Sequence, residues 1–263
     1  MSDAPGLHLA AVYTREVAAS LARIWENVFD WEHLAHLHDS SFAKCDLLDR
    51  GAWGWRVALV TSSRPEGPQV IEMRADRAAG RYVSTTLEGT GAGTEIRVAL
   101  ALRETEITGV TVEFHVPEGS LDRLAAIGAA YTAAYSRLWD EDEAMMQARE
   151  RMLARRKVSN PALPVDLGRV GEVRAALPVV FEFAGQPFRV VDVDGSLVAH
   201  STTCPHWLGP LDDVPVDGGT IRCPWHGYRF DVLSGACLSH KAPPLARAPA
   251  IHLEDGRLVA RAT

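Results

Sequence analysis

Two cysteines and two histidines occur within a short segment, 204–226, as Cys-Pro-His and Cys-Pro-Trp-His. Thiolate sulfur and imidazole nitrogen are ligands of Zn²⁺ and of iron–sulfur clusters. A zinc finger usually pairs Cys with Cys and His with His, whereas each half of this segment carries one of each. The pattern therefore favours a [2Fe–2S] cluster over a zinc ion, with Cys204 and Cys223 on one iron and His206 and His226 on the other.

A second group of metal-type side chains lies in the segment 26–42, which contains His33, His36 and His38 among acidic residues. Two histidines and a carboxylate from elsewhere can hold Fe(II) on one face and leave positions for O₂ and substrate. On an ideal helix, His33 and His38 would point about 140° apart, so the helix must distort or end between them. The alternative is a polar helix end with solvated histidines.

The sequences CPHWLGPL and CPWHGYRFD resemble the two ligand loops of Rieske proteins, and the surrounding strand pattern covers 165–263. The resemblance implies a [2Fe–2S] cluster on the four residues named above. Rieske proteins of respiratory complexes carry two further loop cysteines joined as a disulfide, and Gly209 and Trp225 take their places here. The resemblance therefore implies a low-potential cluster of the ferredoxin or oxygenase type.

The earlier segment resembles the catalytic domain of Rieske non-haem iron oxygenases. The O-demethylase-like branch of that family has the motif Asn-x2-Asp-x2-His-x4-His, and this chain has Asn27, Asp30, His33 and His38 at the same spacings. The resemblance implies that His33 and His38 bind a mononuclear iron. The family spacing disfavours His36, which is otherwise a competing ligand.

The third iron ligand of that family is an Asp in the final helix of the catalytic domain. The stretch 140–150 matches it loosely, so the resemblance implies Asp142 as the ligand, with Asp140 as the alternative. In these oxygenases the carboxylate at the place of Asp30 bridges an iron-bound His to a Rieske His of a neighbouring subunit within a ring of three. The resemblance implies the same catalytic role for Asp30.

This resemblance implies a terminal oxygenase component, in which electrons pass through the Rieske cluster to Fe(II). The implied reaction is hydroxylation or oxidative demethylation, with O₂, of a small organic substrate that is apolar or aromatic. The implied partners are an NAD(P)H-dependent reductase or a ferredoxin, and the implied assembly is a homotrimer. Two other functions stay open: a ferredoxin-type electron carrier and a redox sensor, each fused to a ligand-binding domain without catalytic iron.

The elements that position the histidines of the segment 26–42 form an α+β domain. Helical spacing covers 18–38, with Leu21, Ile24, Trp25 and Val28 on one face. Several alternating strand patterns follow, and a second, long helix is expected over about 120–157. This order resembles the helix-grip (START/SRPBCC-like) arrangement, which implies an antiparallel sheet wrapped around a long C-terminal helix and a cavity.

The Cys/His segment 204–226 lies on an all-β domain, because short strands separated by turns recur to the end of the chain. The predicted organisation is a helix-grip domain at 1–157, a Pro-containing linker at 158–168 and a Rieske domain at 169–263. This order is the reverse of the usual order in the resembling oxygenases.

Aromatic and aliphatic side chains alternate on the predicted strands of the first domain. Trp53, Trp55, Val112 and Phe114 lie on strand faces that either line an apolar substrate pocket or form ordinary core. The sequence leaves both interpretations open.

The composition excludes several classes of protein. The net charge of −7 argues against a general nucleic-acid binder, and the absence of a long apolar run argues against a membrane span. The N-terminal segment shows no basic region before an apolar run, and four cysteines are too few for a disulfide scaffold. We therefore expect a cytoplasmic protein in which Cys45 and Cys237 are small hydrophobic side chains.

Overall fold

The chain divides into two units, Met1–Gln147 and Ala148–Thr263, and each is described by itself. The computed structural model describes residues 6–155 and 160–262. The predicted domain end at 157 and the start of the predicted linker lie outside the described residues. The last residues of that linker already belong to a strand, β8 (Val165–Arg169), and the predicted domain limits stay a prediction.

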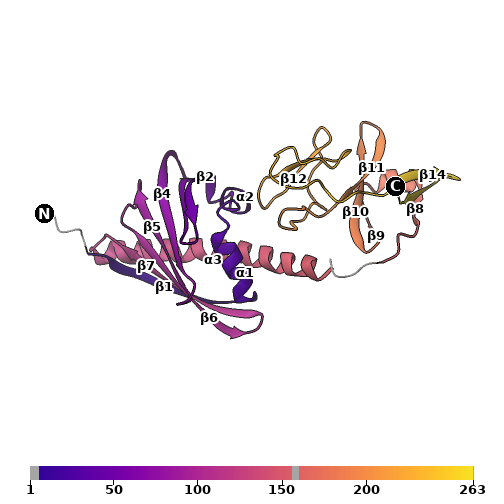
Figure 1. Cartoon of the computed structure of the whole chain (residues 1–263). Coiled ribbons are helices and arrows are strands. Elements are labelled where there is room, and N and C mark those ends of the chain that lie inside the picture. The colour runs from indigo at the N-terminus through magenta and orange to yellow at the C-terminus, as the bar shows by residue number, and fades with distance from the viewer. Residues whose placement is uncertain (1–5, 156–159, 263) are drawn as a thin grey trace. The chain divides into compact units, whose positions relative to one another are not determined.

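The N-terminal unit is one antiparallel sheet of seven strands with most of a long helix, α3 (Leu121–Arg155), whose last residues belong to the other unit (Figure 1). The strands neighbour one another in the order β1-β7-β6-β5-β4-β3-β2. This architecture confirms the predicted helix-grip arrangement. The strands are β1 (His8–Val17), β2 (Phe42–Gly51), β3 (Gly54–Thr61), β4 (Arg64–Asp76), β5 (Arg81–Glu88), β6 (Glu95–Glu104) and β7 (Ile107–Val116).

Strand β7 shows how the sheet and the long helix share a core. Its alternate residues Val112 and Phe114 are completely buried, as expected of a strand with one apolar face. The Phe114 ring stacks on Tyr131 of α3, with ring centroids 5.0 Å apart, and meets Tyr135 edge-on at 5.0 Å. A Cβ atom at Gly128 of α3 would lie 2.4 Å from the backbone oxygen of Ala10, so only glycine permits this close approach to β1.

The predicted single helix over 18–38 is wrong in its length. Helix α1 (Leu21–Phe29) begins at its N-cap Ser20, ends before Asp30 and buries Ile24, Trp25 and Val28 as predicted. A separate short helix, α2 (Leu34–Leu37), follows. The break lies before His33, rather than between the two histidines.

The C-terminal unit consists of small sheets and one short helix, α4 (Val170–Ala175) (Figure 1). β11, β10 and β9 form one sheet, β12 and β13 a second, and β14, β15 and β8 a third. The strands after β8 are β9 (Val179–Phe183), β10 (Gln186–Val193), β11 (Ser196–Ser201), β12 (Thr220–Arg222), β13 (Arg229–Asp231), β14 (Ala250–Glu254) and β15 (Arg257–Arg261). The predicted all-β character is confirmed.

Among the described residues, no helix is both long enough and apolar enough to cross a membrane.

Candidate metal centres

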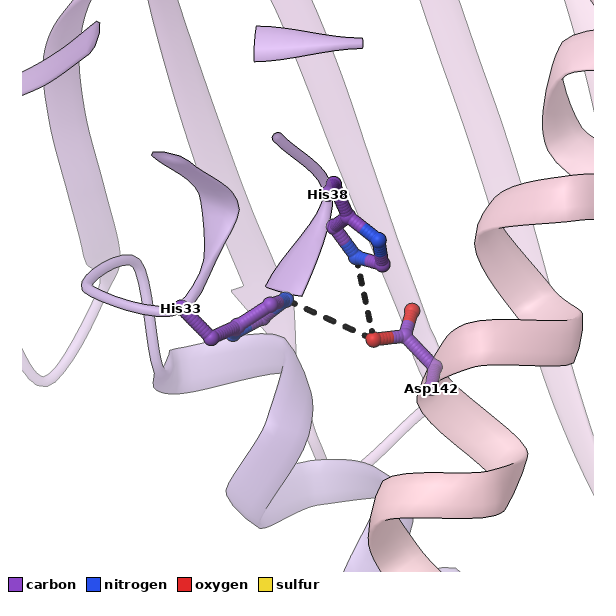
Figure 2. A group of neighbouring side chains, drawn as sticks. All are labelled: His33, His38 and Asp142. Carbon is purple, nitrogen blue, oxygen red and sulfur yellow. Dashed lines mark ion pairs between the residues drawn. The ribbon is translucent and has the colours of Figure 1, made fainter. Parts of the chain in front are cut away.

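His33, His38 and Asp142 meet in the N-terminal unit, as Figure 2 shows. One ligand-type atom from each residue lies within 4.8 Å of the others. His33 and His38 are the cap residues at the two ends of α2, so their rings are released from helical spacing and turn toward the same point. Asp142 reaches that point from α3, which places a carboxylate opposite the two imidazoles.

Both imidazole rings direct their Nε2 atom toward Asp142. His38 Nε2 lies 3.1 Å and His33 Nε2 lies 3.4 Å from Asp142 Oδ1. The other ring nitrogen of each faces a second carboxylate: His33 Nδ1 lies 3.4 Å from Asp30, and His38 Nδ1 lies 2.5 Å from Glu141. Metal-binding histidines usually present one nitrogen to the ion and hold the other against a carboxylate or carbonyl.

A buried amide completes the hydrogen bonding of Asp142. Asn27 Nδ2 donates to Asp142 Oδ1 at 2.9 Å, and Asn27 is only 5% exposed. Asn27 belongs to the motif found in the sequence, but its contact was not predicted. Glu141 was missed altogether, and its only signal was its position beside Asp142.

The electrostatics of the group favour a cation. Burial opposes the charged form of His38, but hydrogen bonds and charges from Asp142 and Glu141 outweigh burial and raise the pKa of His38. Burial likewise opposes ionisation of Asp142, while His38, His33 and Asn27 hold the pKa of its carboxyl below the ordinary value. The carboxylate therefore stays ionised in a buried site.

The two residues that competed with this set lie elsewhere. Asp140 is exposed and forms an ion pair with Arg15 at 2.5 Å, so its carboxylate is held away from the histidines. His36 is not part of the group of potential metal ligands found among the described residues.

Two imidazoles and one carboxylate on one side of a cavity fit the ligand set of a non-haem Fe(II) site with open positions. The cavity has a volume of about 860 Å³, and His33, His38 and Asp142 all line it. Trp55 lines the cavity as well. Val112 and Phe114 are core residues instead, and Trp53 lies under Arg74, whose guanidinium carbon is 4.9 Å from the ring centroid.

The four residues expected to hold the cluster lie on two loops of matching backbone conformation. The Cys204 carbonyl accepts from Leu208 N and the Cys223 carbonyl accepts from Gly227 N, both at 2.9 Å. In each loop the residue four places after the cysteine has positive φ, 66° at Leu208 and 68° at Gly227. Such a φ is uncommon for leucine, so the first loop is held in this conformation by its surroundings.

The loops bring the sulfur and nitrogen ligands together in pairs. Cys204 and Cys223 are each 1% exposed, and their side chains are hydrogen-bonded to one another. This contact lowers the pKa of Cys223 and raises that of Cys204, because one thiolate is stabilised by the other thiol. The ring centroids of His206 and His226 lie 4.5 Å apart. Two thiols and two imidazoles in separate pairs fit the two irons of a cluster that has Cys on one iron and His on the other.

Comparison with known proteins identifies the domain that contains both loops. Residues 164–251 match the family model described as Rieske [2Fe-2S] domain. These residues form a Rieske [2Fe–2S] domain.

The curated relatives of the Rieske domain are ferredoxins. Ferredoxin CarAc of Metapseudomonas resinovorans is 33% identical over 72 residues, which are 27% of this chain and 58% of that ferredoxin. The chain therefore spans less than two thirds of its length. The ferredoxin component of the naphthalene 1,2-dioxygenase system of Pseudomonas putida is 27% identical over 75 residues, which are 28% of this chain and 72% of that protein.

Solved structures resemble each half of the chain separately. The ferredoxin of carbazole 1,9a-dioxygenase from Nocardioides aromaticivorans IC177 has a TM-score of 0.34 at 26% identity, covering 38% of this chain and 98% of that one. A START superfamily protein from Mycobacterium smegmatis has a TM-score of 0.41 at 18% identity, covering 52% of this chain and 96% of that one. The N-terminal fold is defined by its own strand order and long helix.

Gly209 of the Rieske domain lies where the two loops approach each other. A Cβ atom at this position would be 2.9 Å from Cys223 Sγ and 3.0 Å from Trp225 Cδ2. The two positions that correspond to the respiratory disulfide are therefore adjacent, with an indole ring against a glycine. Cys237 is half-buried, as is Cys45 in the other unit, and neither is disulfide-bonded.

A buried Arg–His pair supports the first cluster loop of the Rieske domain. Arg189 Nε donates to His200 Nε2 at 3.0 Å. The guanidinium also donates to the carbonyls of Asp212, at 2.8 Å, and Val214, which follow that loop in the chain. His200 Nδ1 faces the Ser201 carbonyl at 2.9 Å, so the pair connects β10 and β11 to the loop.

Proposed function

We propose that this protein is the oxygenase component of a Rieske-type O₂-dependent oxidoreductase. In this proposal Cys204, His206, Cys223 and His226 bind the [2Fe–2S] cluster. His33, His38 and Asp142 bind a mononuclear Fe(II). A substrate enters the cavity beside the Fe(II) site and is hydroxylated or oxidatively demethylated.

One observation carries the proposal: two imidazoles present the same ring nitrogen to one carboxylate, and each has its other nitrogen beside a separate carboxylate. One imidazole beside Asp142 would be enough to form a buried ion pair. A second imidazole with its own carboxylate adds a desolvation cost without improving packing. A cation among the two Nε2 atoms and Asp142 accounts for the whole arrangement.

The residues of the chain would then divide the work. Asp30 and Glu141 would fix the ring orientation and tautomer of His33 and His38, and Asn27 would hold Asp142. The apolar cavity wall would exclude bulk water from the substrate. Fe(II) bound there would supply the activation of O₂, with electrons delivered through the cluster.

Iron content tests the proposal directly. The full chain should contain about three irons and two acid-labile sulfides, because a Rieske cluster accounts for two of the irons. Asp142→Ala should lower the iron by about one per chain and leave the visible spectrum of the cluster unchanged. Asp140→Ala is the matched control, since that carboxylate is bound to Arg15 and exposed. Iron content that is the same in both variants would contradict the proposed site.

A second candidate function is electron transfer alone. The curated relatives of the Rieske domain are named as ferredoxins, which favours a carrier whose N-terminal domain binds a ligand without iron. Two irons per chain, unchanged by Asp142→Ala, would support this function or a redox sensor. For the oxygenase and for the electron carrier alike, we expect a low reduction potential of the cluster, since no disulfide joins the two loops.

The remaining expectations belong to the same proposal. Electrons would come from an NAD(P)H-dependent reductase or a ferredoxin, and the protein would act in the cytoplasm as a homotrimer. Asp30 would connect His33 to a cluster histidine of a neighbouring subunit.

A further inference from the structure

Two tyrosines line the cavity that also contains His33, His38 and Asp142. Tyr82 lies on β5 and Tyr135 lies on α3. Neither hydroxyl has a hydrogen-bond partner within the part of the chain that the structure describes. Both residues are half-buried and line the cavity, so these two hydroxyls are available to a molecule bound there.

Both tyrosine rings are held by aromatic neighbours. The Tyr135 ring meets Phe114 edge-on at 5.0 Å, and the Tyr82 ring meets Trp25 edge-on at 6.3 Å. Phe114 and Trp25 belong to the buried core. The hydroxyls are therefore fixed polar points on an otherwise largely apolar wall.

The two hydroxyls are hydrogen-bond donors at all ordinary pH values. Burial raises the pKa of both groups, and the negative charge of Asp142 raises them further. A neutral acceptor oxygen, such as that of a ketone or an aryl ether, suits two O–H donors.

The cavity extends along α3 on both sides of Tyr135. Its lining residues on α3 run from Ile127 to Asp142, a helical rise of roughly 22 Å. Tyr135 and Asp142 are seven residues apart, close to two helical turns, and lie on the same face of α3. A volume of about 860 Å³ is near the upper end of the range for small-molecule sites.

We propose that the cavity takes an elongated, mainly apolar molecule whose neutral acceptor oxygen is held by Tyr82 and Tyr135. The inference deepens the proposed function by naming the chemical class of molecule that the same cavity would take. The binding preference itself does not depend on iron.

Three naphthalenes of similar shape test the inference on the full chain without reductant: 2-acetylnaphthalene, 2-methoxynaphthalene and 2-ethylnaphthalene. Titration calorimetry should show that one of the oxygenated probes binds more tightly than 2-ethylnaphthalene. The identity of the tighter probe shows whether the cavity prefers a ketone or an ether. Tyr82→Phe and Tyr135→Phe should each weaken that probe about 2- to 10-fold and leave 2-ethylnaphthalene unchanged. Each substitution removes only a hydroxyl, so the core stays filled.

Tyr131→Phe is the matched control. Tyr131 lines the same cavity on the same helix, but its hydroxyl is hydrogen-bonded to Thr94, so its loss should leave the preference between probes unchanged. The inference is overturned if no probe binds, or if the preference is the same in the wild type and in the Tyr82→Phe Tyr135→Phe double variant. A tyrosine-dependent preference in a chain with only two irons would support the inference and contradict the proposed oxygenase function.

Discussion

Lowering the pH should destabilise the Rieske domain through one buried histidine, His200. Its Nε2 accepts a hydrogen bond from Arg189 Nε, so the proton of the neutral ring is on Nδ1, where it is donated to the Ser201 carbonyl. Burial, together with the charge of Arg189, lowers the pKa of His200 to about 4 from an ordinary value of 6.5. A second proton on this ring would face a guanidinium.

The size of the effect follows from the two pKa values. Between about pH 6.5 and pH 4 the unfolded chain binds a proton at this residue and the folded chain does not. The stability contribution is therefore complete above about pH 6.5 and falls by about 1.4 kcal/mol for each pH unit below it. It becomes level again below about pH 4, after a total loss of roughly 3 kcal/mol.

The assay is urea unfolding of the full chain between about pH 4 and pH 8, followed by the visible circular dichroism of the cluster. His200→Gln is the informative variant, because glutamine stays neutral and its side-chain oxygen can still accept from Arg189. The free-energy difference between the wild type and this variant cancels the titration of all shared groups. It should rise by roughly 3 kcal/mol from pH 4 to pH 6.5 and then stay constant.

The control variant is His252→Gln, which changes an exposed histidine in the same domain. Its unfolding curve should follow the wild type across the pH range. A wild-type minus His200→Gln difference that is independent of pH would refute the reasoning, because it would mean that His200 titrates alike in the folded and unfolded chains.

Three further predictions concern the two metal centres. Gly209→Ala should destabilise the Rieske domain by about 1–3 kcal/mol, measured by urea unfolding, because its Cβ would lie 2.9 Å from Cys223 Sγ; unchanged stability would contradict the close packing of the loops. Glu141→Ala should weaken Fe(II) binding about 10- to 100-fold in a chelator competition, with the cluster spectrum intact, since His38 loses its carboxylate. Asp30→Asn should keep all metals, because Asp30 is not one of the three proposed iron ligands, but should greatly slow electron transfer from cluster to iron in a single turnover; normal turnover would exclude the bridge.

The cluster loops were predictable from the sequence because their order is local. Each loop supplies one Cys and one His within four residues, so the residue types and their spacing can be recognised without any knowledge of the tertiary fold. The support beneath the loops was not predictable. Arg189 and His200 lie on separate strands, and only the antiparallel register that pairs Arg189 with His200 brings them together.

The N-terminal group was only partly predictable. The spacing of Asn27, Asp30, His33 and His38 indicated an iron-type motif, but helical periodicity in the same segment hid the end of α1 at Phe29. An amphipathic pattern continues across a break when the residues after the break are also half-buried. The resemblance implied a cavity, but Tyr82 and Tyr135 on its wall were not predicted, because a cavity is left where side chains from several strands and a helix do not meet.

Helix α3 explains why one carboxylate, and not its neighbour, faces the histidines. Residues two apart on a helix point about 200° apart, so Asp140 and Asp142 must lie on nearly opposite faces. Arg15 of β1 forms ion pairs with both Asp140 and Glu143, and Glu143 also accepts from the backbone N–H of Ala18 at 2.8 Å. These contacts fix the rotation of α3 on its outer side, and the same rotation turns Asp142 toward the cavity. The choice between Asp140 and Asp142 therefore depended on a strand more than 120 residues earlier in the chain. No local pattern in 140–150 contained that information.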